Sequence, residues 1–260
     1  MFEFVREVGW RTVDNVHGLG GIAVYGSQLV YETLAPPYRL RRLVDELYNS
    51  GVLSLAIICT SGTAVGFVLA LQGYNTLVRF GAEQSVGAVV GLSLIRELGP
   101  VLTALLVTGR AGSAIAAEIG AMVATEQLDG LRMMSVDPVD YVAQPKALGL
   151  ALSMPLLSAL FIVFGLFGGY LVGVGLLGVD AGTYISSLEN NIDFRNDVLG
   201  SLLKSIVFGM IVALIATWRG YTAAPNSAGV SRATTGAVVQ ASVATLMFDY
   251  VITALWGVGI

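Results

Sequence analysis

The sequence predicts an all-α integral membrane protein, with an N-terminal interfacial helix followed by five transmembrane helices. Of its 260 residues, 55% are hydrophobic and 12% are charged, whereas soluble domains carry about 25% charged residues. The charges are also segregated, which leaves uncharged runs of roughly the 20 residues that a hydrocarbon core of about 30 Å requires. The 32 glycines agree with this class, because glycine is more frequent in membrane helices than in soluble ones.

The first fifty residues differ from the rest of the chain. Residues 13–34 are mildly apolar but interrupted by polar groups and glycines, and residues 36–50 are amphipathic and basic. This pattern favours a helix lying in the membrane interface, with a sixth span as the alternative. We therefore divide the chain into an N-terminal amphipathic segment (1–46) and a five-span domain (47–260). No basic stretch precedes an apolar run at the start, so we expect no cleavable signal peptide.

Five segments have the length and composition of membrane spans: 51–72, 87–109, 147–178, 198–218 and 233–260. The third is longer than the others and contains Pro155, so we expect it to be tilted or kinked. Glycines recur every four residues in three places: Gly62/Gly66, Gly87/Gly91 and Gly165/Gly169/Gly173. Such faces allow helix backbones to approach closely, although the general abundance of glycine in membrane helices also produces such pairs.

Basic residues predict the orientation of the spans. Ten of them flank the spans on one side: Arg6, Arg11, Arg39, Arg41, Arg42, Arg110, Arg132, Lys146, Arg219 and Arg232. The loops on the other side hold only Arg79 and Arg195. Because basic loops remain in the cytoplasm, we expect a cytoplasmic N-terminus and, after five spans, a C-terminus outside.

The second span contains two adjacent charges, Arg96 and Glu97. At about 1.5 Å per residue, Arg96 lies roughly 14 Å from the outer end of the span. Neighbours on a helix point about 100° apart, so at least one charge needs a partner on another helix, on another subunit, in water or in a ligand. Pro100 lacks the N–H that would bond the carbonyl of residue 96, so we expect that carbonyl to be free and the helix to bend there.

Three further polar residues lie at a similar depth: Lys204, Asp249 and Gln72. Ionisable residues inside a bilayer are costly and usually face one another or a cavity. One interpretation is a buried Glu97–Lys204 or Arg96–Asp249 pair that fixes helix packing. The other, which we favour because several groups share this depth, is a polar cavity open toward the outer leaflet.

The longest inner loop, 109–146, contains a short helical pattern. Leu128, Leu131 and Met134 recur every three residues, with charged residues on the other faces. This periodicity predicts an amphipathic helix over about 125–135. It either rests on lipid headgroups or docks into a cytoplasmic partner.

Several classes of function are disfavoured. The net charge of −4 and the absence of a basic face argue against nucleic-acid binding. The lone Cys59 and lone His17 are far apart in the sequence, so we expect neither an intrachain disulfide nor a metal site. The chain has no phosphate-binding G-x-x-x-x-G-K-[ST] motif and no G-x-S-x-G motif. We therefore expect a non-catalytic chain that does not hydrolyse ATP itself.

Residues 94–138, LIRELGPVLTALLVTGRAGSAIAAEIGAMVATEQLDGLRMMSVDP, resemble the signature region of the MlaE (YrbE-type) permeases. These are membrane subunits of lipid-transporting ABC systems in Gram-negative bacteria, mycobacteria and chloroplasts. The resemblance extends over essentially the whole chain, from the N-terminal segment to the fifth span.

The resemblance implies a permease subunit in the bacterial inner membrane, with a periplasmic C-terminus. Its substrate would be phospholipid moved between the inner and outer membranes, which maintains outer-membrane lipid asymmetry. The implied partners are a second copy of the chain, a dimer of a cytoplasmic ABC ATPase, a STAS-domain protein and a periplasmic MCE-domain hexamer. ATP and Mg²⁺ would bind the ATPase, and we expect no cofactor in this chain.

The resemblance also assigns roles to residues. Arg96, Glu97 and Lys204 match the family's charged positions near the lipid cavity, and Gln72 lies close to them in the expected fold. The helix at about 125–135 matches the coupling helix, with Glu126, Gln127, Leu128, Asp129, Leu131, Arg132 and Met134 as the residues expected to transmit ATPase motion.

Two other functions compete with lipid transport. An ion-coupled secondary transporter would use Glu97, Lys204 or Asp249 as a proton relay, but such carriers usually have an internal repeat, and we find none. A non-transporting scaffold would account for the inner helix but not for charges at a shared depth.

Overall fold

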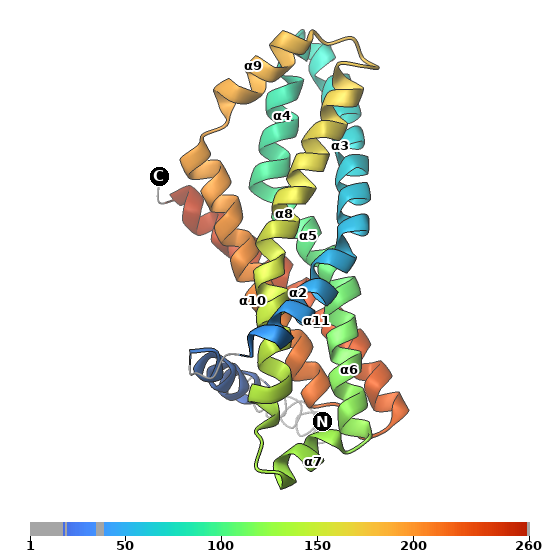
Figure 1. The fold of residues 1–260 in the computed structure, drawn as a ribbon. Helices are drawn as coiled ribbons and strands as arrows, with labels where there is room; N and C mark the ends of the chain where they lie inside the picture. The colour runs from blue at the N-terminus through green and yellow to red at the C-terminus, as the bar shows by residue number, and fades with distance from the viewer. Residues whose placement is uncertain (1–17, 19, 35–38, 259–260) are drawn as a thin grey trace, which may run out of the picture.

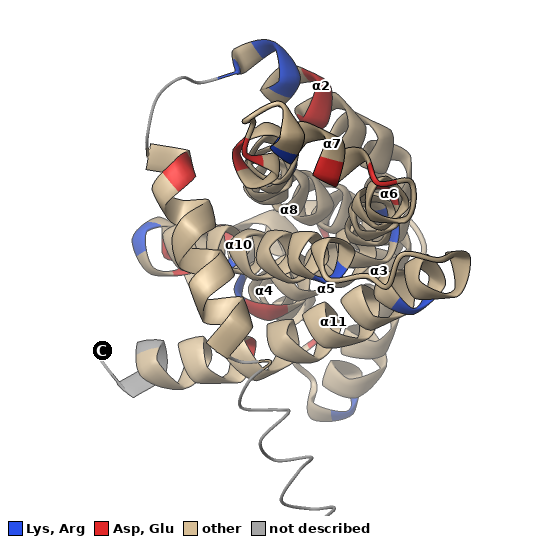
Figure 2. Ribbon diagram, turned by 90° about the horizontal axis from the view of Figure 1, so that it is seen from below, with Lys and Arg blue, Asp and Glu red and all other residues tan. Residues whose placement is uncertain are grey.

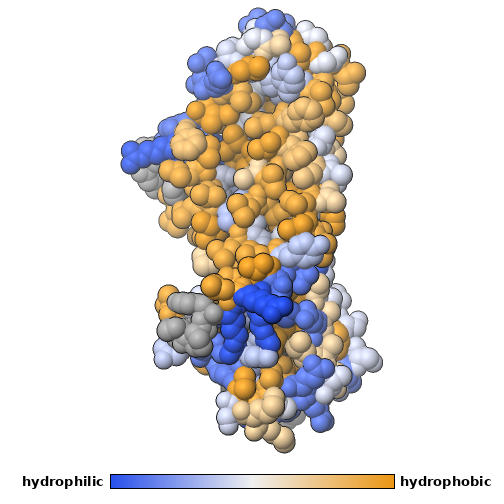
Figure 3. Space-filling model, viewed as in Figure 1, coloured by the Kyte–Doolittle hydropathy of each residue, from blue (hydrophilic) through white to orange (hydrophobic). Residues whose placement is uncertain are grey.

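The computed structural model describes residues 18, 20–34 and 39–258, and within these ranges every regular element is a helix. Five helical segments are long and apolar enough to cross a membrane: Leu40–Phe80, Glu83–Ala124, Val139–Gly173, Phe194–Tyr221 and Ser227–Leu255. They form an elongated bundle (Figure 1) whose middle is largely apolar on the visible face, with hydrophilic residues toward both ends (Figure 3). The five predicted spans are therefore confirmed as helices of spanning length.

The N-terminal part of the described chain is helical over 20–34 and again in α2 (Leu40–Ser50). Tyr25 is buried, with its ring centroid 5.3 Å from that of Trp218 and 5.5 Å from that of Tyr221. The helix over 20–34 is thus held against α10 (Leu199–Tyr221). The boundary that we predict between residues 46 and 47 falls inside α2. Residues 1–17, 19 and 35–38 of the predicted amphipathic segment lie outside the described residues, and its interfacial placement stays a prediction.

Helix α2 is tied to the start of the third span by two arginines. Arg39 pairs with Asp140 at 2.8 Å, and the guanidinium of Arg42 lies 3.6 Å from the ring centroid of Tyr141. Asp140 and Tyr141 belong to the π-helical turn η6 (Val139–Ala143), which leads into α8 (Gln144–Gly173). Helix α8 continues through Pro155.

The first span is completed by the 3₁₀ turn η1 (Val52–Ser54), α3 (Leu55–Leu77) and the 3₁₀ turn η2 (Val78–Phe80). Helix α3 packs along α8 through the predicted glycines. A Cβ atom built on Gly62 would lie 2.7 Å from the carbonyl oxygen of Phe161, and one built on Gly66 would overlap the carbonyl oxygen of Gly165. The close helix approach predicted from glycine spacing is confirmed for these positions.

The second span is longer than the sequence suggests. It runs through η3 (Glu83–Ser85), α4 (Val86–Ser93), η4 (Leu94–Leu98), α5 (Gly99–Val107), η5 (Thr108–Gly112) and α6 (Ser113–Ala124). The helix does not end at residue 109, where the predicted span ends, because Ile115, Ala116 and Ile119 are buried and α6 packs against α10 and α11 (Ser227–Val258). This packing keeps the segment helical beyond the expected membrane boundary.

The predicted helix at about 125–135 is the shorter helix α7 (Gln127–Met133). Glu126 and Ser135, on either side of it, both have a φ of 58°. This left-handed conformation is unfavourable for residues other than glycine and does not continue a right-handed helix. The two residues therefore limit α7 to seven residues, at the opposite end of the bundle from α9 (Ala181–Asn191) (Figure 1).

The segment 179–197, expected to be a loop, contains α9 and the π-helical turn η7 (Phe194–Val198). Asp180 caps α9 by accepting a hydrogen bond of 2.9 Å from the backbone N–H of Thr183, and this bond holds the pKa of Asp180 below its ordinary value. Tyr184 is buried against Gly87 and Gly173, and this burial raises its pKa to about 12. The helix α9 therefore folds back over the ends of α4 and α8.

Candidate functional site

The site begins at an irregularity in the second span. Arg96 and Glu97 lie in η4, a π-helical turn that is followed directly by Gly99 and Pro100. Turns of this kind occur mostly as single insertions in α-helices and are frequent at functional sites. The carbonyl oxygen of Arg96 accepts a hydrogen bond of 2.9 Å from Nζ of Lys204. The carbonyl that Pro100 was predicted to free is thus occupied by a cation from α10.

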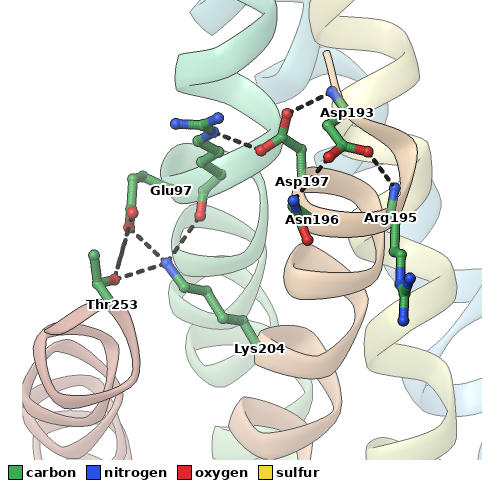
Figure 4. Close-up of polar contacts among 8 residues, drawn as sticks. Glu97, Asp193, Arg195, Asn196, Asp197, Lys204 and Thr253 are labelled. Atoms are coloured by element: carbon green, nitrogen blue, oxygen red, sulfur yellow. Dashed lines mark hydrogen bonds and ion pairs between the residues drawn. The ribbon is translucent and has the colours of Figure 1, made fainter. Parts of the chain in front are cut away.

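Lys204 is the centre of an ion cluster. Its Nζ lies 2.8 Å from Oε2 of Glu97, 3.3 Å from Oδ1 of Asp249 and 2.8 Å from Oγ1 of Thr253. Figure 4 shows the lysine side chain pointing between Glu97 and Thr253. Since only 8% of the Lys204 side chain is exposed, two carboxylates compensate the cost of burying its charge.

Arg96 has a different partner. Its Nε lies 2.7 Å from Oδ1 of Asp197, which belongs to η7 and has a side chain that is 4% exposed. The other oxygen of Asp197 accepts the backbone N–H of Asp193 at 2.9 Å, and Asp193 in turn accepts the backbone N–H of Arg195 at 3.0 Å (Figure 4). This chain of hydrogen bonds fixes the carboxylate that holds the arginine.

Only one of the three nitrogens of the Arg96 guanidinium, Nε, takes part in this contact. The Arg96 side chain is 54% exposed, and its Nε–Asp197 bond is its one side-chain hydrogen bond within the part of the chain that the structure describes. Its two terminal nitrogens therefore remain available as donors. Glu97 is also accessible, with a side chain that is 42% exposed.

Four segments supply this cluster: η4, η7, α10 and α11. It contains the cations Arg96 and Lys204 and the carboxylates Glu97, Asp197 and Asp249. Of the two pairs considered in the packing interpretation, Glu97–Lys204 is present, whereas Arg96 and Asp249 each contact a different partner. The favoured cavity open toward the outer leaflet stays a prediction. Asp197 was missed, since it lies in a segment that we took for an outer loop.

Gln72, the fourth predicted site residue, does not join these groups within the chain. It lies near the end of α3 and is exposed. In the described part of the structure, its side chain forms no hydrogen bond with the cluster. Its role stays a prediction.

The second predicted site, α7, presents a different face from the expected one. Leu128 is 4% exposed and Leu131 is packed against the core, whereas Met133 and Met134 are 88% and 67% exposed. The stripe Leu128–Leu131–Met134 is thus not a single outward surface, because its first two members hold α7 against the bundle. Met133, which the three-residue period missed, is the most exposed apolar side chain of the helix.

The polar residues of α7 are exposed around these methionines. Glu126 and Gln127 lie at its start, and Arg132 pairs with Asp129 at 2.6 Å. Arg132 also donates a hydrogen bond of 2.6 Å to the hydroxyl of Tyr221, at the end of α10. This bond raises the pKa of Arg132 and links α7 to the fourth span.

The family model described as permease MlaE matches residues 43–255. This chain belongs to the MlaE permease family. The intermembrane phospholipid transport system permease protein MlaE of Haemophilus influenzae is 45% identical over 254 residues, which cover 97% of each chain. A probable ABC transporter permease protein of Rickettsia bellii is 38% identical over 98% of each chain. The chloroplastic protein TRIGALACTOSYLDIACYLGLYCEROL 1 of Arabidopsis thaliana is 31% identical over 90% of this chain and 67% of its own length.

The match to the MlaE family model includes both sites. It begins in α2 and ends in α11 at residue 255, so it contains the whole ion cluster and the whole of α7. The family resemblance seen in residues 94–138 is thereby confirmed. As an MlaE permease, the chain is a multi-pass membrane subunit of a transport system.

Proposed function

We propose that this chain is the permease subunit of an ABC transporter that moves phospholipid between the inner and outer membranes and so maintains outer-membrane lipid asymmetry. The observation that carries this proposal is the ion cluster around Lys204, in which the side chains of Arg96 and Glu97 are about half exposed. It occurs in a chain 45% identical to a protein named as an intermembrane phospholipid transport permease.

The chemistry of the cluster suits a phospholipid, which joins an anionic phosphate to long apolar chains. The free terminal nitrogens of Arg96 donate charge-assisted hydrogen bonds to the phosphate. Lys204 is saturated by Glu97, Asp249 and Thr253 and so keeps Glu97 in place. The exposed carboxylate of Glu97 competes with the phosphate for cations, which favours release.

Apolar surface for the acyl chains lies beside the cluster on α11. Asp249 and Thr253 are on this helix, and its neighbouring side chains line a shallow apolar groove: Val243, Leu246, Met247, Tyr250 and Val251. One five-span subunit is too small to enclose a diacyl lipid. The permease therefore works as a homodimer in which two such faces surround the substrate, with Gln72 near the same cavity.

The remaining parts of the transporter are those that the family resemblance implies, and the predicted orientation assigns each of them to a side of the membrane. With the N-terminus in the cytoplasm and the C-terminus in the periplasm of a Gram-negative cell, α7 lies on the cytoplasmic side of the inner membrane. It is the coupling helix that contacts a dimer of an ABC ATPase, which binds ATP and Mg²⁺ and carries a STAS-domain protein. A hexamer of an MCE-domain protein lies against the periplasmic end, near α9.

Labelled-lipid transfer by the purified complex tests this function. Proteoliposomes that hold the complex are mixed with acceptor vesicles, and transfer is followed in both directions with ATP and with a non-hydrolysable analogue. We expect transfer that requires ATP hydrolysis. Transfer driven by a proton gradient without ATP would indicate a secondary transporter, and an intact complex that moves no lipid would indicate a scaffold.

A further inference from the structure

A second ion cluster lies at the α7 end of the bundle. Nζ of Lys146, in the first turn of α8, lies 2.7 Å from Oε1 of Glu46 on α2 and 2.8 Å from Oε2 of Glu118 on α6. The lysine side chain is 6% exposed. This one cation therefore joins three helices that come from distant parts of the sequence.

A cavity of about 360 Å³ opens beside this lysine. Seen from the α7 end, α7 lies near the ends of α6 and α8, with α2 alongside (Figure 2). The cavity lies between these helices and has an apolar wall and a charged wall. Met122, Leu128 and Leu131 line the first, and Asp45, Glu118 and Lys146 line the second.

The lining of the cavity holds more carboxylates than cations. The two cations in its lining are Arg42 and Lys146. Arg42 stacks on Tyr141 and donates a hydrogen bond of 2.8 Å to its carbonyl oxygen, and Lys146 is held by two carboxylates. Three carboxylates face these two cations, and Asp45 is exposed and forms no ion pair within the described residues.

Glu118 adds a second free acceptor. Its side chain is 54% exposed and lines the cavity, and Oε2 is the oxygen that contacts Lys146, so Oε1 takes part in no ion pair within the described residues. A long cationic side chain fits such a lining, because its methylene stem packs on apolar residues while its charged head reaches carboxylates.

We propose that this cavity receives a single lysine or arginine side chain of the cytoplasmic ATPase. The proposal rests on the proposed function, which supplies the ATPase as the partner on this side. Leu128 and Leu131 of α7 form part of the cavity wall, and Met133 at the end of this helix and Met134 directly after it are exposed. An ATPase that packs on these methionines therefore has the cavity within reach, and its cation is held between Asp45 and Glu118.

Through this contact the ATPase would interact with other helices of the permease besides α7. A cation bound to Glu118 and Asp45 interacts directly with α6 and α2, and through Lys146 it is connected to α8. Movement of the ATPase is then transmitted to the first three spans together.

Charge reversal at Asp45 tests the contact. The tagged permease is co-expressed with its ATPase and purified, and the ATPase retained per permease is measured. We expect Asp45→Lys to reduce retention at least about tenfold, as for other contacts in which one partner of a close charge pair is removed, and Asp45→Asn to reduce it less. The matched control is Glu189→Lys, the same change in charge on exposed α9. Thermal melting checks that all three variants fold.

Cross-linking identifies the occupant. Cys59 is the one cysteine of the sequence, so Asp45→Cys in a Cys59→Ser background carries a single thiol. A short maleimide–succinimide reagent then links position 45 to nearby amines. If the ATPase inserts a lysine, we expect the reagent to capture that lysine. If it inserts an arginine, we expect the reagent to capture an ATPase lysine next to that arginine. Replacing the identified lysine or arginine of the ATPase by glutamate should then restore retention of the ATPase by the Asp45→Lys permease.

Three results would overturn the proposal. Equal retention by wild type, Asp45→Lys and the double variant Asp45→Lys/Glu118→Lys would refute the cavity contact and leave the proposed function intact. Cross-linking of position 45 to an aminophospholipid instead of the ATPase would assign the cavity to a lipid headgroup. A wild-type permease that retains no ATPase would refute both proposals.

Discussion

Nε of Arg96 lies 2.7 Å from Oδ1 of Asp197, 101 positions away in the sequence. The carboxylate is buried, whereas the guanidinium is half-exposed. A buried anion of this kind fixes the arginine through Nε, while the two terminal nitrogens form no hydrogen bond within the described residues. Asp197 is therefore a positioning residue for the proposed phosphate contact of Arg96.

Replacement of Asp197 by asparagine should reduce lipid transfer without unfolding the permease. The amide oxygen still accepts the N–H of Asp193, but the charge that orients Arg96 is lost. A hydrogen bond to a charged group contributes about 1.5–3 kcal/mol, so we expect transfer to fall at least about tenfold. The measurement is labelled-lipid transfer by reconstituted Asp197→Asn complex.

The matched control is Asp193→Asn, because Asp193 belongs to the same turn but does not contact Arg96. It should keep nearly normal transfer. Equal losses in the two variants would mean that the turn as a whole matters, and that Asp197 has no specific effect on Arg96.

Part of this site is predictable from sequence, and part is not. Pro100 removes one backbone donor at a known position, so the free carbonyl of Arg96 follows from local chemistry. Similar depth predicted that Lys204 and Glu97 could meet. Depth does not distinguish Asp249 from Asp197 as the partner of Arg96, because that choice depends on how η7 turns back into the bundle.

Removal of the Lys204 charge should destabilise the fold. In Lys204→Met, Glu97 and Asp249 lose their shared cation and repel each other. Breaking a buried pair costs about 3–5 kcal/mol, and we expect the lower end of this range because Glu97 is 42% exposed. The melting temperature of the detergent-solubilised permease measures this loss.

The exchange Glu97→Lys/Lys204→Glu separates stability from transport. It keeps one charge of each sign between η4 and α10, so we expect assembly to recover at least in part while lipid occupancy and transfer remain low. Full transfer by the exchanged pair, with unfolding of each single variant, would show that these charges serve only packing.

In the fold as well, features set by the local sequence were predicted, whereas features set by contacts between distant segments were not. Uncharged runs predicted the five spans, since length and hydropathy are local properties. The continuation of the second span to Ala124 depends on burial of Ile115 and Ile119 against other helices. The helical structure of α9 depends on the docking of Tyr184 among glycines of α4 and α8. Neither contact is visible in a local pattern.

A methyl group at Gly66 should disrupt the packing of α3 on α8. Its Cβ would overlap the carbonyl oxygen of Gly165, which belongs to the backbone and cannot rotate away. Overpacking typically costs about 1–3 kcal/mol and occasionally more, and a backbone clash should lie at the upper end. We expect Gly66→Ala to lower the melting temperature and the yield of folded permease.

Gly73→Ala is the control for this substitution, because it lies in the same helix and its nearest neighbour would be a Val89 methyl at 4.0 Å. It should be neutral or slightly stabilising, since alanine favours helices over glycine by about 1 kcal/mol. Similar losses at both positions would show that flexibility of α3 matters more than its close approach to α8.

The two exposed methionines at the end of α7, Met133 and Met134, should be needed for ATPase binding but not for folding. Met133 and Met134 are 88% and 67% exposed, so aspartate at these positions meets solvent in the free permease. In the complex, the same charges would be buried against an apolar surface without a partner, which is strongly unfavourable. We expect Met133→Asp/Met134→Asp to lose most of the co-purifying ATPase at an unchanged melting temperature.

Leu131→Asp provides the contrast, because Leu131 packs against the core inside the permease. It should lower the melting temperature first and lose the ATPase as a consequence. This difference arises because Leu128 and Leu131, three residues apart, share the inward face of α7, whereas Met133 lies on another face and Met134 lies just beyond the end of the helix. If the double methionine variant keeps the ATPase and its hydrolysis rate, the partner binds another surface, and the exposed methionines of α7 have no part in coupling.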